Sequence, residues 1–208
     1  MNVVSNYLIV WTGVHCHSAY MFKTIFLLVL EILPVIIFFI LGQSLSFRDA
    51  TSIYIFMTIV SISAIWFWTR RISYLSLIIG TVIVGAGSLS VWFHNPEILL
   101  LADTIYYLGA AATLLFLQLH NHNLFYTLFK HTFGMSARGW DILVYRWIIA
   151  LIIVGISNEL VRQFGTIPDW FMFQLIKTFL LLFFAAYQFT LTKKYRLPDE
   201  TTAWGIRI

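Results

Sequence analysis

The stretch YRWIIALIIVGISNELVRQFGTIPDWFMFQLIKTFLLLFFAAYQFTL, residues 145–191, contains two long apolar runs on either side of a short polar turn. The runs are Tyr145–Val161 and Trp170–Leu191, and each approaches the roughly 20 residues that a helix needs to cross the hydrocarbon core of a membrane. Because the connection is short, the two helices are expected to be antiparallel neighbours. The stretch therefore predicts a transmembrane helical hairpin.

Four further apolar runs precede this hairpin: Phe22–Leu41, Ala50–Trp68, Ser73–Phe93 and Ile98–Leu119. The 208-residue chain is 60% hydrophobic and only 11% charged, whereas a soluble domain carries about 25% charged residues. We therefore predict an all-α, polytopic transmembrane helical bundle with six apolar segments. Glu31 and Pro34 interrupt the first run, and proline can kink or break a helix. If the first segment is re-entrant, five spans remain.

Basic residues fall mainly on one side of these runs if all six cross the membrane. The ten residues on that side are Lys23, Arg70, Arg71, Lys130, Arg138, Arg146, Lys193, Lys194, Arg196 and Arg207. Arg48 and Arg162 lie on the opposite side, and Lys177 lies inside a run. The positive-inside rule then places both termini in the cytoplasm. We interpret the net charge of +4 as anchoring against anionic lipid rather than as a nucleic-acid footprint.

The segments outside the apolar runs divide the chain. Residues 1–20 contain no basic residue and so lack the charged start of a signal peptide. We expect them to be a dispensable extension or a mis-assigned start, followed by a transmembrane domain over 21–192 and a cytoplasmic tail over 193–208. Leucines and phenylalanines at helical spacing predict that Asn123–Phe133 is an amphipathic helix on the cytoplasmic interface.

Charged and polar residues inside the apolar runs point to function, because a charge there costs about 2.5–3.5 kcal/mol unless it is paired. Asp103, Asn158, Glu159, Arg162 and Lys177 all fall in the outward half of the predicted bundle. We predict that they form one cluster in which Lys177 reaches Asn158 or Glu159. One interpretation is a buried network that fixes the helix register. The other is a site for a proton, an ion or a lipid headgroup.

The turn His94-Asn95-Pro96 precedes the fourth run, and Asn95, Pro96 and Glu97 suit the cap and first turn of a helix. The histidines show no spacing typical of a metal site, and the chain contains no nucleophile elbow, phosphate loop or dinucleotide motif. We therefore predict no enzymatic activity, with no catalytic, metal-binding or cofactor-binding residues.

Four stretches of the chain carry a family resemblance: Glu31–Phe39; Trp92–Glu97 with Thr104 after it; Gly139-Trp140 with Arg146-Trp147; and Asn158–Arg162 followed by Thr166, Trp170 and Lys177. Together they resemble the intracellular septation protein A family of bacterial inner-membrane proteins. The resemblance covers about residues 22–191, and its last stretch is specific. The chain departs from the family at Leu100 and Ala102, where lysines are usual. Asp103 stands in place of an apolar residue or proline, and Asp141 in place of a basic one.

The resemblance implies a multi-pass inner-membrane protein that supports cell envelope biogenesis, envelope integrity and septation, without an established catalytic reaction. We expect it to act through other inner-membrane division or envelope proteins and through membrane lipids, with no nucleic-acid partner. The alternative is a small transporter or lipid-handling protein that uses Asp103, Glu159 and Lys177 near the outer leaflet.

Overall fold

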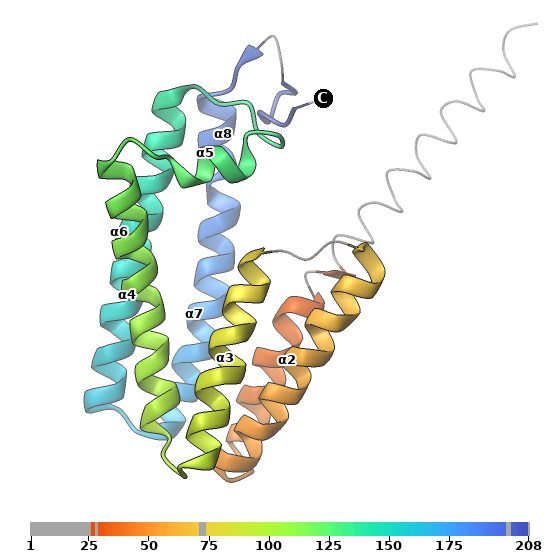
Figure 1. Ribbon diagram of the computed structural model, residues 1–208, viewed down its shortest axis with the longest axis vertical. Helices are drawn as coiled ribbons and strands as arrows, with labels where there is room; N and C mark the ends of the chain where they lie inside the picture. The colour runs from red at the N-terminus through yellow and green to blue at the C-terminus, as the bar shows by residue number, and fades with distance from the viewer. Residues whose placement is uncertain (1–25, 28, 71–73, 199–200, 208) are drawn as a thin grey trace, which may run out of the picture.

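The computed structural model describes residues 26–27, 29–70, 74–198 and 201–207 (Figure 1). The expectation for residues 1–20, and the placement of Lys23 and Arg71, lie outside the described residues. After the helical segment Val29–Gly42, the helices are α2 (Phe47–Thr69), α3 (Tyr74–Trp92), α4 (Glu97–Leu119), α5 (Leu124–Phe129), α6 (Ala137–Phe164), α7 (Ile167–Tyr187) and α8 (Phe189–Lys194).

Four helical stretches are long and apolar enough to cross a membrane by length and composition. They are Phe47–Thr69, Glu97–Leu119, Ala137–Phe164 and Ile167–Lys194, and two shorter apolar helices, Val29–Gly42 and Leu77–Trp92, accompany them. The predicted all-α, polytopic membrane bundle is confirmed. The first of the shorter helices continues through Pro34, so the proline does not break it.

Turns and caps set the ends of the helices. Ser46 caps α2 by accepting a hydrogen bond from Asp49 N, and Thr166 and Asp169 form a reciprocal capping box at the start of α7. The α5 helix is shorter than the predicted Asn123–Phe133. Asn123 caps it as expected for a helix start, accepting from Tyr126 N at 2.9 Å. It ends at Phe129 because the next residues turn to pair with the C-terminal tail.

The bundle has two distinct ends (Figure 1). The turns at residues 43–46, 93–96 and 165–166 lie at one end, called the turn end here. The short helices α5 and α8 and the C-terminal tail lie at the opposite, tail end. Between them α4 packs most extensively on α6, and α2 packs on α3. The core nearest the candidate site consists of Phe38, Ala50, Leu99, Leu100, Trp170 and Phe171.

The chain after α8 folds back on the loop between α5 and α6. Antiparallel bridges join Phe133 to Ile206 and Met135 to Arg196. Gly134 N donates to Gly205 O at 3.0 Å, and Leu197 N donates to Gly134 O at 3.0 Å. The sequence predicted only a cytoplasmic tail here, whereas backbone hydrogen bonds fix it to the body of the protein. Residues 130–138, 193–198 and 201–207 are called the tail clasp below.

Candidate functional site

A buried ion pair joins α7 to α4. Lys177 Nζ lies 2.5 Å from Asp103 Oδ2, and the same oxygen accepts a hydrogen bond from Gln174 Nε2 at 2.8 Å. The Lys177 side chain is only 4% exposed, and its ammonium lies 4.6 Å from the centre of the Tyr107 ring. The carboxylate and the ring face together compensate a cation that would otherwise be costly at this depth.

The partner of Lys177 differs from the prediction, which was Asn158 or Glu159. Trp170 of α7 lies at the same depth in the bundle as Asn158 of α6, because its indole Nε1 donates to Asn158 Oδ1 at 3.1 Å. Lys177 lies two turns further along the same face, about 10 Å deeper. Helical side chains lean toward the helix N-terminus, so its stem points back toward the turn end and meets Asp103. Depth along the helices alone suggests Glu159 as the partner of Lys177. The rotation of α7 about its axis instead turns Lys177 toward Asp103 on α4.

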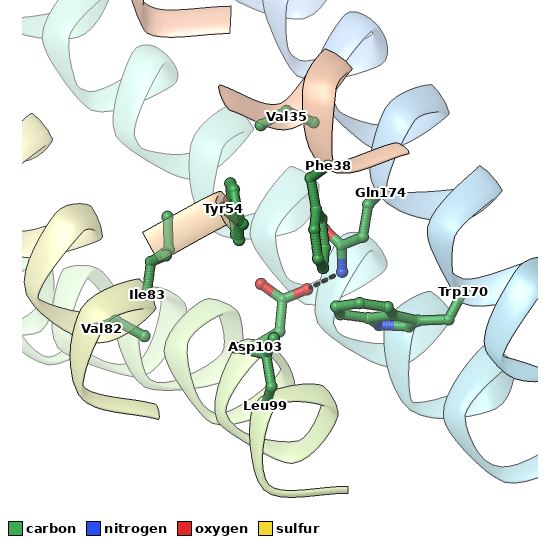
Figure 2. A pocket seen from close by; sticks show the side chains of 9 residues that line it. All are labelled: Val35, Phe38, Tyr54, Val82, Ile83, Leu99, Asp103, Trp170 and Gln174. Carbon is green, nitrogen blue, oxygen red and sulfur yellow. Dashed lines mark hydrogen bonds between the residues drawn. The ribbon is translucent and has the colours of Figure 1, made fainter. Parts of the chain in front are cut away.

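A small cavity adjoins the Asp103 carboxylate (Figure 2). Its volume is about 40 Å³, and its walls are Val35, Phe38, Tyr54, Val82, Ile83, Leu99, Asp103, Trp170 and Gln174. One water molecule needs roughly 10–15 Å³ by this kind of measure. The cavity therefore has room for only a few waters or a comparably small ion, with the carboxylate and the Gln174 amide as its polar wall.

Asn158 is the buried polar centre of the α4–α6–α7 contact and has no exposed surface. Its Nδ2 donates to Leu100 O at 3.0 Å and to Thr104 Oγ1 at 2.8 Å, while its Oδ1 accepts from Trp170. Both donor hydrogens and the carbonyl are therefore satisfied, as a buried amide requires. The residue links three helices through one side chain.

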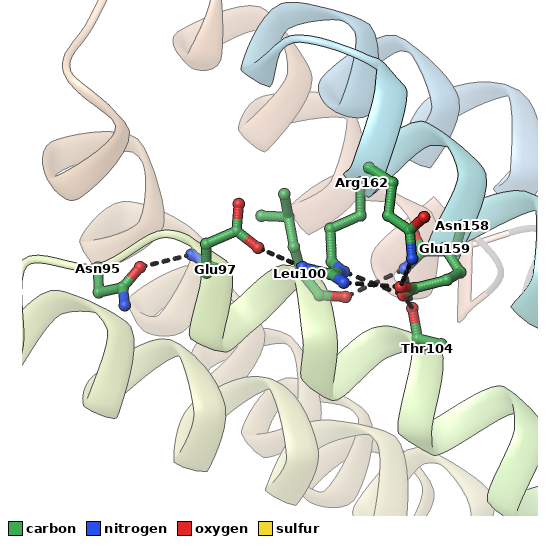
Figure 3. Close-up of polar contacts among 8 residues, drawn as sticks. Asn95, Glu97, Leu100, Thr104, Asn158, Glu159 and Arg162 are labelled. Atoms are coloured by element: carbon green, nitrogen blue, oxygen red, sulfur yellow. Dashed lines mark hydrogen bonds and ion pairs between the residues drawn. The ribbon is translucent and has the colours of Figure 1, made fainter.

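A polar ladder continues from Asn158 toward the turn end (Figure 3). Thr104 Oγ1 donates to Glu159 Oε2 at 3.2 Å. Arg162 holds both oxygens of Glu159, at 2.9 Å from Nε and 2.6 Å from Nη2. Its Nη1 donates to Glu97 Oε2 at 2.6 Å. This forked geometry is the strong, directional form of a carboxylate–guanidinium contact, and it ties the start of α4 to the end of α6.

The predicted cluster therefore consists of two polar groups. One is the Asp103–Lys177 pair, and the other is the ladder through Asn158, Glu159 and Arg162. Trp170 touches both, since it lines the Asp103 cavity and donates to Asn158. The cluster has three further members: the sequence analysis named Thr104 and Trp170 only as part of the family resemblance, and it did not name Gln174. Gln174 was detectable, because it stands three residues before Lys177 and so shares its helix face.

The turn before α4 holds His94, Asn95 and Glu97 in separate roles. Asn95 Oδ1 accepts from Glu97 N at 3.0 Å, while the cap position itself falls on Pro96, one residue later than expected. His94 has a φ of 53°, in the left-handed region. Its Nε2 lies 2.9 Å from Arg48 Nη1 and its Nδ1 lies 3.2 Å from Trp92 O. Since a guanidinium only donates, Nε2 accepts and Nδ1 carries the proton.

A family model for intracellular septation protein A matches residues 26–199. The chain belongs to the intracellular septation protein A family. Relatives named inner membrane-spanning protein YciB are 27% identical over 178 residues in Nitrobacter hamburgensis, covering 85% of this chain and 89% of that protein. A Bradyrhizobium relative of the same name is 26% identical over 172 residues, covering 82% and 86%. One from Brucella melitensis is 29% identical over 153 residues, covering 73% and 69%. No solved structure is significantly similar.

Membership of this family assigns the chain to inner-membrane-spanning proteins linked to septation and envelope integrity. Within the described residues, no three side chains of His, Cys, Asp or Glu come together to hold a metal ion. The chemistry that the site offers is charge pairing and hydrogen bonding between helices, with a small cavity beside Asp103.

Proposed function

We propose that this septation protein A family member supports envelope biogenesis and septation without catalysing a reaction, by binding other membrane-embedded envelope or division proteins. The observation that carries the proposal is that the charged side chains within and at the ends of the apolar helices bind one another. Lys177 pairs with Asp103, and Arg162 pairs with Glu159 and Glu97. Such pairing fixes how the helices pack and leaves their apolar outer faces as the surface offered to partners in the membrane.

The outer face of α7 illustrates that surface. Ile176, Phe179, Leu180 and Phe183 are exposed, at 49%, 38%, 61% and 70%. Their spacing places them on one stripe of the helix. The opposite face of α7 carries buried Phe171 and Lys177. The polar network thus orients α7 so that a defined apolar stripe faces the bilayer, where packing and not hydrophobicity selects helix partners.

Site-specific photo-crosslinking in native membranes tests this proposal. A photoreactive side chain at Phe183, the most exposed residue of the stripe, is expected to capture one or a few discrete membrane proteins of the envelope or division machinery. The same group at Phe171, which is 1% exposed, is the matched control and should capture only this chain. Lipid adducts alone at Phe183, and equally at Ile176 and Leu180, would argue against a protein-binding role for this face.

A transport or lipid-handling activity is the alternative, and the continuous ladder from exposed Glu97 to buried Asn158 is the feature that favours it. Flux and lipid-scrambling assays in liposomes compare the wild type with Glu159→Gln. The partner-binding proposal predicts no protein-dependent flux or scrambling in either. Activity above protein-free vesicles that falls in the variant would replace the proposal with the alternative.

A further inference from the structure

The tail clasp gathers positive charge on a fixed scaffold at the tail end of the bundle. The sequence segments 130–138 and 193–208 contain six Lys and Arg residues against two acids, Asp199 and Glu200, a difference of +4. The clasp is held by backbone contacts, including Ser136 N to Tyr195 O at 2.9 Å and Arg207 N to Thr132 O at 2.9 Å. Its charges are therefore presented in a defined arrangement rather than on a free tail.

The lysines of the clasp lie over aromatic rings. Lys193 Nζ is 5.0 Å from the ring centre of Trp204, Lys194 Nζ is 5.6 Å from that of Tyr195, and Lys130 Nζ is 5.7 Å from that of Tyr126. The three ion pairs formed between described residues lie on α4, α6 and α7 and involve none of these lysines. A ring face orients a cation but leaves it its full charge and its hydrogen-bond donors.

Exposed apolar side chains lie in the clasp and directly before it in the chain. Trp204 is 52% exposed, Phe129 is 41% exposed and Ile206 is 39% exposed. Indole and phenyl rings beside ammonium groups are typical of the boundary between headgroups and acyl chains. Lys193 and Lys194 of the clasp are the last two residues of the spanning stretch Ile167–Lys194, so the clasp lies at the end of that stretch, at the tail end of the bundle (Figure 1).

We infer that the tail clasp is a binding surface for anionic phospholipid headgroups, with Lys130, Lys193 and Lys194 contacting the phosphates. This inference does not depend on the proposed function. The inferred surface differs from the general bias of basic residues that orients a membrane protein, because it requires the folded clasp and three particular lysines. Four to eight basic residues next to a spanning helix attract anionic lipid with about a fivefold gain per charge. The exposed rings of Trp204 and Phe129 insert between the headgroups and hold the lysines at phosphate depth.

The test uses the full chain in bilayers, with spin-labelled phosphatidylglycerol and phosphatidylcholine as probes of the lipids that contact the protein. The wild type is expected to prefer phosphatidylglycerol to phosphatidylcholine by well over fivefold. The triple variant Lys130→Gln, Lys193→Gln and Lys194→Gln should lose at least fivefold of that preference, while the same three positions changed to Arg should keep it. Arg48→Gln, which removes an exposed cation at the turn end, is the control for net charge and should have little effect.

Two further arms separate the sources of the signal. Soluble glycerol phosphate should not compete with the labelled lipid, and raising the salt from 0.1 to 1 M, which shortens the Debye length from about 10 to about 3 Å, should weaken the preference. The unfolding midpoint in neutral lipid should be the same for all variants. An unchanged preference in the triple variant overturns the inference, as does an equal loss in Arg48→Gln. Competition by glycerol phosphate or by an acidic peptide would make the clasp a different kind of anion site.

Discussion

Lys177 is a buried cation whose charge is compensated by one carboxylate, that of Asp103. It is the only charged side chain among the buried residues that the structure describes. Removing one member of a buried pair leaves the other charge uncompensated, at a cost of about 3–5 kcal/mol. We predict that Lys177→Met lowers the free energy of unfolding by that amount in detergent or bicelles. The double variant Lys177→Met with Asp103→Leu should regain much of the loss. Equal stability of wild type and Lys177→Met would contradict the pairing.

Asn158 should be the next most sensitive polar residue. Asn158→Leu removes three hydrogen bonds and leaves the Trp170 indole N–H and the Leu100 carbonyl without their partner. Polar contacts between membrane helices average about 0.6 kcal/mol and reach about 1.7 kcal/mol. We therefore expect a loss of about 2 kcal/mol, measured by the same unfolding titration. A matched test is Trp170→Phe, which deletes only the indole donor and should cost less.

The identity of these residues could be read from the sequence, but their pairing could not. Polar side chains within apolar runs stand out by composition, and so Asp103, Asn158, Glu159, Arg162 and Lys177 were all selected. Which of them touch depends on the rotation of each helix about its axis. A difference of one residue along a helix turns a side chain by about 100°. Asp103 and Thr104 are adjacent in sequence, yet one meets Lys177 and the other meets Asn158 and Glu159.

Close approach of α4 and α6 depends on Gly155. A Cβ atom there would lie 2.7 Å from Leu108 Cδ2 and 2.8 Å from Leu108 Cγ, so the Leu108 side chain or the helices would have to shift. We predict that Gly155→Ala costs about 1–3 kcal/mol through overpacking. Gly109 is the matched control, since nothing lies within 4 Å of a Cβ atom at that position. Gly109→Ala should be neutral or stabilise by up to about 1 kcal/mol.

The hydropathy of the sequence indicates where the spanning helices lie, but it does not indicate the polar residues that lengthen them at their ends. The run Tyr145–Val161 became α6, Ala137–Phe164, because Arg138 and Asp141 are compatible with a helix although they are not apolar. The α5 helix is shorter than predicted: Phe133 lies outside it, because Phe133 pairs with Ile206. That long-range contact has no local signal, so the tail clasp could not be predicted from periodicity. Element type follows from local sequence here, whereas element ends follow from packing.

For the whole molecule, the two ends of the bundle differ in their number of basic residues, and such a difference orients a protein in a membrane. The tail end carries the lysines and arginines of the clasp, while the exposed basic residue at the turn end, Arg48, is bonded to His94. Translocating the clasp would move many basic residues across the membrane, which the positive-inside rule disfavours. We predict that a reporter fused after Ile208 lies in the cytoplasm. A reporter that works only in the cytoplasm should therefore be active, and one that works only in the periplasm should be inactive.

The complementary measurement labels the turn end. With the native Cys16 changed to Ser, His94→Cys places a thiol in an exposed turn that should react with a membrane-impermeant maleimide added from the periplasmic side. Ala203→Cys, in an exposed part of the clasp, should react only after the membrane is opened. If the clasp thiol reacts from outside, the molecule is inverted, and the inferred headgroup surface would face the outer leaflet. The charge asymmetry of the bundle predicts instead that the Asp103–Lys177 pair lies nearer the periplasm and the clasp lies in the cytoplasm.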